Sequence, residues 1–122
     1  MSATKKKFAF ILKTSPEKKS QALTTLDQSL SLDDAGHEVR IYLDAAGTQL
    51  SQRFDDEHPL GEYLQEAKDR DLIVGACGLC AVNYGTVEDL QDVGLDVLGD
   101  GTEHSINVEE LVDEGYELKF VS

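Results

Sequence analysis

Residues 72–80 read Leu-Ile-Val-Gly-Ala-Cys-Gly-Leu-Cys, and this stretch decides the fold. Residues 72–76 contain no polar side chain, which is typical of a strand buried on both faces of a parallel sheet. Cys77 stands at the end of this strand, and residues 79–84 fit a short helix behind it. Gly78 leaves the turn between them uncrowded, so that a backbone N–H can approach the sulfur. The stretch therefore predicts a thiol held at a strand-to-helix junction.

Short apolar runs alternate with amphipathic stretches on both sides of this segment, as in βα units on a parallel sheet. The expected strands cover residues 8–12, 39–43, 72–76, 95–98 and 116–121, the last at an edge of the sheet. The pattern predicts a three-layer α/β/α sandwich with a mainly parallel sheet of about five strands. We expect residues 7–122 to form a single domain and residues 1–6 a flexible tail.

Helix boundaries follow from capping residues. Ser15-Pro16 predicts the start of the first helix, and Ala35-Gly36 its end. Residues 60–70 predict a second helix, and the polar residues 45–59 before it a loop or short helix. Thr86 is expected to cap one more helical turn, and Asn107 a last helix that Gly115 ends.

The charge is strongly acidic, with a net value of −13 over 122 residues. Residues 1–19 carry six lysines against one acidic residue, whereas the rest carries five basic residues against 23 acidic ones. Such a surface repels phosphates, so we expect no direct nucleic-acid partner. The excess of acidic residues has two open explanations, namely solubility and a salt-adapted source. No apolar run approaches a membrane span and no secretory signal is recognisable, so we expect a cytoplasmic protein without membrane contact.

Candidate site residues follow the expected strands, because working groups of parallel sheets gather beyond the carboxyl ends of the strands. Lys13 and Thr14 follow the first strand, Asp44 the second and Cys77 the third. Cys77 has the strongest chemical character. The thiolate is the nucleophilic form, and free N–H groups at a helix N-terminus favour that anion.

The second cysteine, Cys80, completes a Cys-x-x-Cys pair in which the first thiol usually attacks and the second resolves the product as a disulfide. The pair is also half a zinc site. Because no second pair exists and the histidines at 37, 58 and 104 have no paired spacing, we expect neither a metal ion nor a cofactor. His104 alone is expected near Cys77, as a donor to a thiolate or persulfide; the alternative is an ordinary surface residue.

Three segments resemble the DsrE/DsrF-like sulfurtransferase family: residues 35–43 (AGHEVRIYL), 44–50 (DAAGTQL) and 76–85 (ACGLCAVNYG). In the last, Cys77 and Gly85 stand where that family has a sulfur-accepting cysteine and a glycine eight positions on. The resemblance implies a five-stranded parallel sheet with helices on both faces and a transient persulfide on Cys77. It also implies a homo-oligomer, often a trimer or hexamer, and sulfur donor and acceptor proteins as partners.

Three functions remain open at this point. The first is an intracellular sulfur carrier or sulfurtransferase that holds persulfide sulfur on Cys77 and relays it to an acceptor. The second is a thiol–disulfide redox protein that uses Cys77 and Cys80 together. The third is a non-catalytic oligomeric binding module, in which the thiol has ordinary reactivity. The first requires an accessible thiolate at position 77.

Overall fold

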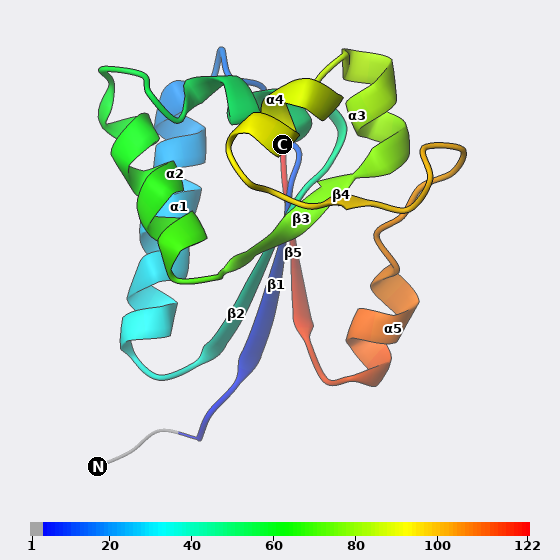
Figure 1. Cartoon of the computed structure of the whole chain (residues 1–122). Helices are drawn as coiled ribbons and strands as arrows, with labels where there is room; N and C mark the ends of the chain where they lie inside the picture. The colour runs from blue at the N-terminus through cyan, green and yellow to red at the C-terminus, as the bar shows by residue number, and fades with distance from the viewer. Residues whose placement is uncertain (1–3) are drawn as a thin grey trace.

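The computed structural model describes residues 4–122, and its centre is an all-parallel five-stranded sheet with the order β4-β3-β2-β1-β5 (Figure 1). The expected sheet is therefore confirmed, with its last strand at an edge. Residues 1–3 of the expected tail lie outside the described residues. The strands are β1 (Lys7–Leu12), β2 (Glu38–Leu43), β3 (Ile73–Cys77), β4 (Val97–Leu98) and β5 (Glu117–Val121).

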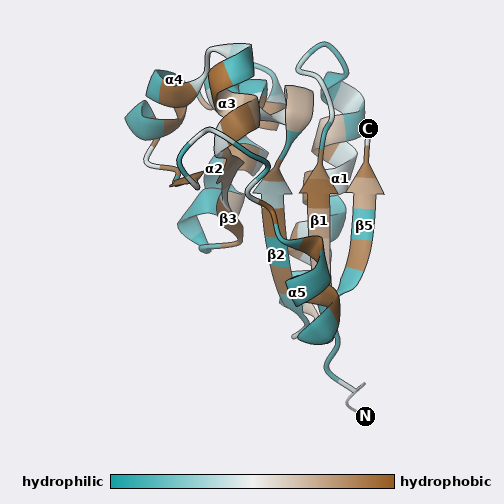
Figure 2. Ribbon diagram, turned by 90° about the vertical axis from the view of Figure 1, so that its right-hand side faces the viewer, coloured by the Kyte–Doolittle hydropathy of each residue, from teal (hydrophilic) through white to brown (hydrophobic). Residues whose placement is uncertain are grey.

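Helices cover both faces of this sheet, which confirms the three-layer arrangement (Figures 1 and 2). One face carries α1 and α2, while α5 lies on the other. The helices are α1 (Lys19–Asp34), the 3-10 helix η1 (Ala45–Arg53), α2 (Pro59–Asp69), α3 (Gly78–Tyr84), α4 (Val87–Asp92) and α5 (Val108–Asp113). Among the described residues, no helix is long and apolar enough to cross a membrane.

The apolar core is split by the sheet into two parts of unequal size. The larger part includes Leu26, Ile41 and Leu64, all fully buried between the sheet and the α1–α2 layer. The smaller part, beneath α5, includes Ile11 and Leu111. Alternate residues of β1 and β2 point to opposite faces, so both strands contribute to both parts of the core, as the apolar run of β1 predicts.

The first helix begins later than expected, at Lys19 rather than at Ser15-Pro16. The Ser15 hydroxyl accepts the N–H of Glu17, and the Ser15 carbonyl accepts the N–H of Lys18 at 2.9 Å. These bonds close a separate turn, in which Pro16 takes a turn position instead of the first helical position. The prediction was wrong because the same Ser-Pro pair fits both structures.

Two other expectations are corrected by hydrogen bonds that sequence does not display. Strand β4 holds two residues, not four, because the Leu95 N–H bonds to the Leu90 carbonyl at the end of α4 instead of joining the sheet. Thr86 does not cap α4 with its side chain; its hydroxyl donates to the Ala81 carbonyl. The Asn107 cap is confirmed, because its side-chain oxygen accepts the Glu110 N–H at 3.1 Å.

Candidate functional site

The site lies where β2 and β3 end side by side, because Leu43 pairs with Ala76 in the parallel register. Each of these two strand ends carries a functional group: Asp44 directly follows β2, and Cys77 is the last residue of β3. Helix α3 begins directly behind Cys77, and its first turn brings Cys80 back over the same edge. The topology thus places a carboxylate and two thiols together, as expected for the carboxyl edge of a parallel sheet.

Gly78 allows a third segment to reach this edge. A Cβ atom at position 78 would lie 2.4 Å from the carbonyl oxygen of Leu98 and 3.3 Å from the nitrogen of Gly101. Only glycine therefore lets the exit of β4 pass so close to α3. The segment of residues 99–105, here called the cover loop, continues from this contact. It turns at Gly99 and Gly101, where φ is +74° and +87°, and carries His104 over the thiols.

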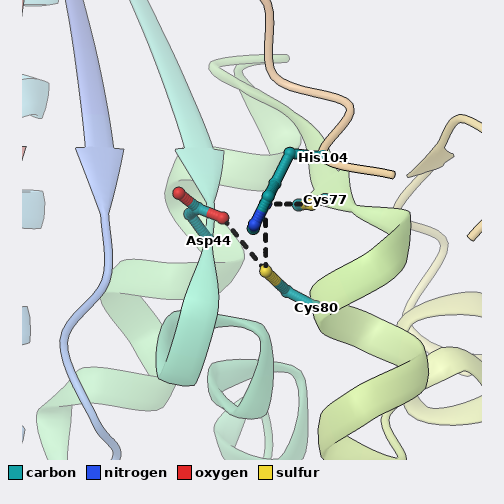
Figure 3. Close-up of side chains that lie close together, drawn as sticks. All are labelled: Asp44, Cys77, Cys80 and His104. Atoms are coloured by element: carbon teal, nitrogen blue, oxygen red, sulfur yellow. Dashed lines mark hydrogen bonds between the residues drawn. The ribbon is translucent and has the colours of Figure 1, made fainter. Parts of the chain in front are cut away.

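Hydrogen-bond donors surround the Cys77 thiol, and Figure 3 shows one of them, the His104 ring. The backbone N–H groups of Cys80 and Ser105 point at its sulfur, and His104 Nδ1 lies 3.6 Å from it. Burial by itself would raise the pKa of the Cys77 thiol. The two backbone donors, together with the His104 and Cys80 side chains, outweigh burial and lower that pKa below its ordinary value. The arrangement favours a thiolate at this sulfur.

The Cys80 thiol experiences the opposite influences. Its sulfur donates a hydrogen bond to Asp44 Oδ1 at 3.3 Å and lies 3.7 Å from His104 Nδ1. Burial, the Asp44 carboxylate and the neighbouring Cys77 sulfur together raise the pKa of Cys80 to about 12, although the Ala45 N–H opposes them. The surroundings of two cysteines three positions apart therefore shift their pKa values in opposite directions, down at Cys77 and up at Cys80. Both are free.

The Cys77 side chain is less accessible than the sequence predicts for a nucleophilic thiol. Its exposed fraction is 0%, and that of Cys80 is 5%. The expectation of an accessible thiol is therefore corrected for this conformation, because the cover loop closes the site. His104 itself is exposed, and an open depression of about 680 Å³ lies beside it, lined in part by Asp100 and Glu109. The backbone N–H groups of Cys80 in α3 and of Ser105 in the cover loop face the sulfur.

Five of the seven expected site residues come together, namely Asp44, Cys77, Gly78, Cys80 and His104, and two do not. The Lys13 ammonium lies 5.6 Å from the centre of the Phe120 ring, near β5. The Thr14 side chain is fully buried, and its hydroxyl has no hydrogen-bond partner among the described residues. Neither makes a hydrogen bond to the thiols, so their predicted roles in substrate binding remain predictions.

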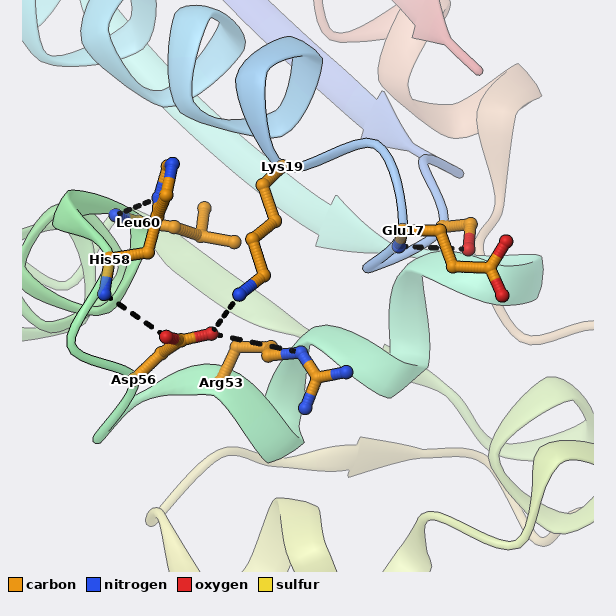
Figure 4. Close-up of polar contacts among 7 residues, drawn as sticks. Glu17, Lys19, Arg53, Asp56, His58 and Leu60 are labelled. Atoms are coloured by element: carbon orange, nitrogen blue, oxygen red, sulfur yellow. Dashed lines mark hydrogen bonds and ion pairs between the residues drawn. The ribbon is translucent and has the colours of Figure 1, made fainter.

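One of the acidic residues after η1, Asp56, has a structural explanation. Asp56 forms an ion pair with Lys19 of α1 at 2.7 Å, accepts the His58 N–H at 3.0 Å and lies 3.9 Å from Arg53 (Figure 4). His58 in turn caps α2 by accepting the Leu60 N–H. These contacts anchor the connection between η1 and α2.

Sequence reasoning missed two partners of the thiols. The Ser105 donor is a backbone N–H, which any residue at that position supplies, so no side-chain signal marks it. The pairing of Asp44 with Cys80 joins two residues that were separate candidates. That both follow neighbouring parallel strands was a usable signal, but the register of β2 against β3 was needed to combine them.

The fold and the site define a parallel α/β protein with a paired-thiol centre at the carboxyl edge of its sheet. The profile of the DsrE/DsrF-like family matches residues 6–118, nearly the whole chain, so the chain belongs to that family. The family is associated with sulfur relay, and its members act with partner sulfur-relay proteins. No curated protein matches the chain.

Proposed function

We propose that this protein is an intracellular sulfur carrier with sulfurtransferase activity, and that it holds persulfide sulfur on Cys77. The observation that carries the proposal is the inequality of the two thiols. Three donors, two backbone N–H groups and an imidazole, converge on the Cys77 sulfur. Cys80 instead donates its proton to Asp44. Membership of a family associated with sulfur relay supports the same function.

Sulfur loading needs only a thiolate and a donor that carries sulfane sulfur. The Cys77 thiolate attacks the outer sulfur of a donor persulfide, R–S–SH. The new bond joins the Cys77 sulfur to that outer sulfur, the S–S bond of the donor breaks, and the donor leaves as the thiolate R–S⁻. The proton stays on the transferred sulfur or passes to solvent. The transferred sulfur keeps its oxidation level as it moves from the donor sulfur to the Cys77 sulfur, so no external oxidant is consumed.

Sulfur release repeats this reaction with the roles exchanged. An acceptor thiolate attacks the outer sulfur of the Cys77 persulfide, and Cys77 returns as the thiolate that the N–H donors stabilise. A stabilised leaving group accelerates this step, since thiols with a lower pKa leave faster. The same donors therefore serve both halves of the transfer.

Cys80 offers a second route out of the persulfide. If its sulfur attacks the inner sulfur of the Cys77 persulfide, a Cys77–Cys80 disulfide forms and hydrosulfide leaves. The attack requires that Cys80 first lose its proton, for which Asp44 is the nearest acceptor. With a pKa raised to about 12, Cys80 resists this loss. We infer that the raised pKa protects the persulfide until an acceptor arrives.

The buried position of Cys77 makes movement of the cover loop part of the proposed cycle. The donor sulfur must come into contact with a sulfur atom whose exposed fraction is 0%. His104 is the exposed side chain above it, at 3.6 Å. Displacement of the cover loop opens the sulfur to a donor, and its return shields the persulfide from water and from stray thiols.

The proposed setting is the cytoplasm, with sulfur donor and acceptor proteins as partners and a homo-oligomer, trimer or hexamer, as the working form. Exposed apolar side chains at Val82, Val112 and Phe120, each more than half exposed, supply surface for such contacts. Analytical ultracentrifugation checks the assembly: a single monomeric species at all concentrations contradicts the oligomer.

Mass spectrometry of the intact protein tests the sulfur carrier directly. After incubation with a low-molecular-weight persulfide and removal of excess reagent, the wild type should gain the mass of one sulfur atom. The Cys80→Ser variant should gain it as well and retain it longer, whereas Cys77→Ser should gain none. Equal loading of Cys77→Ser and wild type would contradict the proposal.

The redox alternative is supported by one observation, namely that the ligand atoms of Cys77 and Cys80 lie within 4.8 Å of each other. It predicts a reversible internal disulfide and complete loss of activity in either single variant. The binding-module alternative predicts a Cys77 thiol of ordinary reactivity. Persulfide retention by Cys80→Ser distinguishes the sulfur carrier from both.

A further inference from the structure

We propose that Asp44, Cys77, Cys80 and His104 also form a binding site for one thiophilic divalent transition-metal ion of the zinc class. The potential ligand atoms of these four side chains all lie within 4.8 Å of one another. They come from three separate segments: the end of β2, the junction of β3 with α3, and the cover loop (Figure 3). The expectation of no metal rested on the lack of a second cysteine pair and on histidine spacing, and chain folding brings Asp44 and His104 to the thiols without either pattern.

The distances between these side chains match a tetrahedral ion. A zinc ion holds sulfur at about 2.3 Å and nitrogen or oxygen at about 2.0–2.2 Å, so its ligand atoms stand about 3.3–3.8 Å apart. The Cys77 sulfur lies 3.6 Å from His104 Nδ1, and the Cys80 sulfur lies 3.7 Å from the same nitrogen and 3.3 Å from Asp44 Oδ1. The remaining pairs need to contract by about 1.5 Å at most. Side-chain rotation is enough for such a change.

The donor set selects the type of ion. Two thiolates, one imidazole and one carboxylate suit zinc and its chemical neighbours, whereas calcium and magnesium require mostly oxygen ligands. Only one of the four donors here is an oxygen. Four protein ligands also fill a tetrahedral sphere, as in structural zinc sites.

Outer contacts hold three of the four ligands in position before any ion binds. The Ala45 N–H donates to Asp44 Oδ1 at 3.0 Å. The N–H groups of Cys80 and Ser105 point at the Cys77 sulfur, and the Ala45 N–H also faces Cys80. Such outer-shell partners orient metal ligands and strengthen binding. His104 is the mobile member, since it lies on the cover loop and is exposed.

Metal binding and sulfur loading would then exclude each other, because both use the lone pairs of the Cys77 sulfur. An ion bridging the three segments also holds the cover loop closed through His104. Metal binding itself does not depend on the sulfur-carrier function, so either property can be present without the other.

The test uses the reduced full-length chain and Co²⁺ as a spectroscopic probe for the zinc class. We expect one Co²⁺ per chain, with the intense visible absorption of tetrahedral cobalt and a thiolate-to-metal charge-transfer band. Zn²⁺ should abolish both bands stoichiometrically, whereas Mg²⁺ and Ca²⁺ at large excess should not. Cu(I) is compared in a separate arm with a copper-specific competitor, and preference for Cu(I) with no tetrahedral cobalt spectrum overturns the zinc assignment.

Variants decide whether His104, Cys80 and Asp44 participate. His104→Ala, Cys80→Ser and Asp44→Asn should each weaken Zn²⁺ binding at least about tenfold in competition with a chromophoric chelator. Glu103→Gln, next to His104 but outside the ligand set, is the matched control and should bind like wild type. Circular dichroism verifies folding, and Asp44→Asn keeps a capping oxygen for η1.

Binding that is unchanged in His104→Ala and Asp44→Asn, or the absence of a cobalt–thiolate band in folded wild type, overturns the proposal. The persulfide experiment is run in parallel with a chelator present. Failure of metal binding with normal sulfur loading refutes only the metal site, and the reverse result refutes only the sulfur carrier.

Discussion

Gly78→Ala should damage the site through a single backbone contact. The added Cβ would lie 2.4 Å from the Leu98 carbonyl oxygen, whereas normal van der Waals contacts begin near about 3.5 Å. The exit of β4 must therefore move by about 1 Å. Overpacking of this kind costs about 1–3 kcal/mol of the free energy of unfolding. At about 4 °C per kcal/mol for a chain of this size, the unfolding midpoint should fall by about 4–12 °C.

The displacement should also reach the thiol. The cover loop follows directly from the contact with Leu98, and it carries Ser105 and His104, two of the donors to the Cys77 sulfur. Moving the loop away weakens these donors, so the pKa of Cys77 should rise toward the value that burial favours. In a Cys80→Ser background, the midpoint of the alkylation rate against pH should shift to higher pH.

Gly85→Ala provides the matched control at the other end of α3. A Cβ atom there meets nothing within 4 Å, but φ is +68°, so the cost is backbone strain of about 1–2 kcal/mol without displacement of the cover loop. The control should lose stability and keep the wild-type pH profile. If Gly78→Ala keeps both the unfolding midpoint and the alkylation profile of wild type, the reasoning about this contact is refuted.

Three further predictions concern single contacts. Asp44→Asn removes a negative charge beside Cys80 and should lower the pKa of that thiol; alkylation of Cys80 in a Cys77→Ser background should then begin at lower pH, and an unchanged profile would contradict the role of the carboxylate. His104→Ala removes a side chain that shields the Cys77 sulfur and donates a hydrogen bond to it. The limiting alkylation rate of Cys77 at high pH should therefore increase, and the midpoint of the rate should move to higher pH. A slower limiting rate would show that the loop does not shield the sulfur. Asn107→Ala removes the cap of α5 and should cost about 1 kcal/mol in urea unfolding, with normal sulfur loading; a loss below 0.3 kcal/mol (about one quarter of a typical cap) would show that the cap is dispensable.

Local patterns were sufficient to predict the sheet. The apolar run of β3 and the alternating character of β5 each carry their own signal, since burial on one or two faces leaves a direct imprint on residue choice. The position of Cys77 at the end of a central strand followed from the same signal. Parallel topology then placed Asp44 at the same edge.

Contacts between distant segments were not predictable in the same way. His104 lies 27 positions from Cys77, and its approach depends on how closely the exit of β4 passes Gly78. Burial of the Cys77 sulfur is a consequence of that loop and has no local signature. Helix α1 begins later than predicted because Ser15-Pro16 fits both a separate turn and a helix start. Hydrogen bonds from the backbone N–H groups of Glu17 and Lys18 to Ser15 decide for the turn.

The charge of the protein bears on which donors can reach the site. The depression beside His104 is lined by Asp100, Glu103 and Glu109, and the chain as a whole carries −13. Small anionic donors such as thiosulfate are repelled by such a surface, whereas the persulfide of a protein with a basic docking segment is attracted. We therefore propose that a protein carrying the donor sulfur next to a basic docking segment suits these acidic surroundings better than thiosulfate does.

The inequality of the two thiols is tested most directly by comparing the single-cysteine variants in the presence of a chelator. Alkylation rates of Cys80→Ser and Cys77→Ser are measured across the same pH range. The lowered pKa of Cys77 predicts that Cys80→Ser begins to react below the pH at which an ordinary thiol ionises. Burial and the Asp44 carboxylate, which raise the pKa of Cys80 and remain in Cys77→Ser, predict that this variant begins to react only at higher pH. Coincident profiles for the two variants, or an earlier onset for Cys77→Ser, would contradict the account.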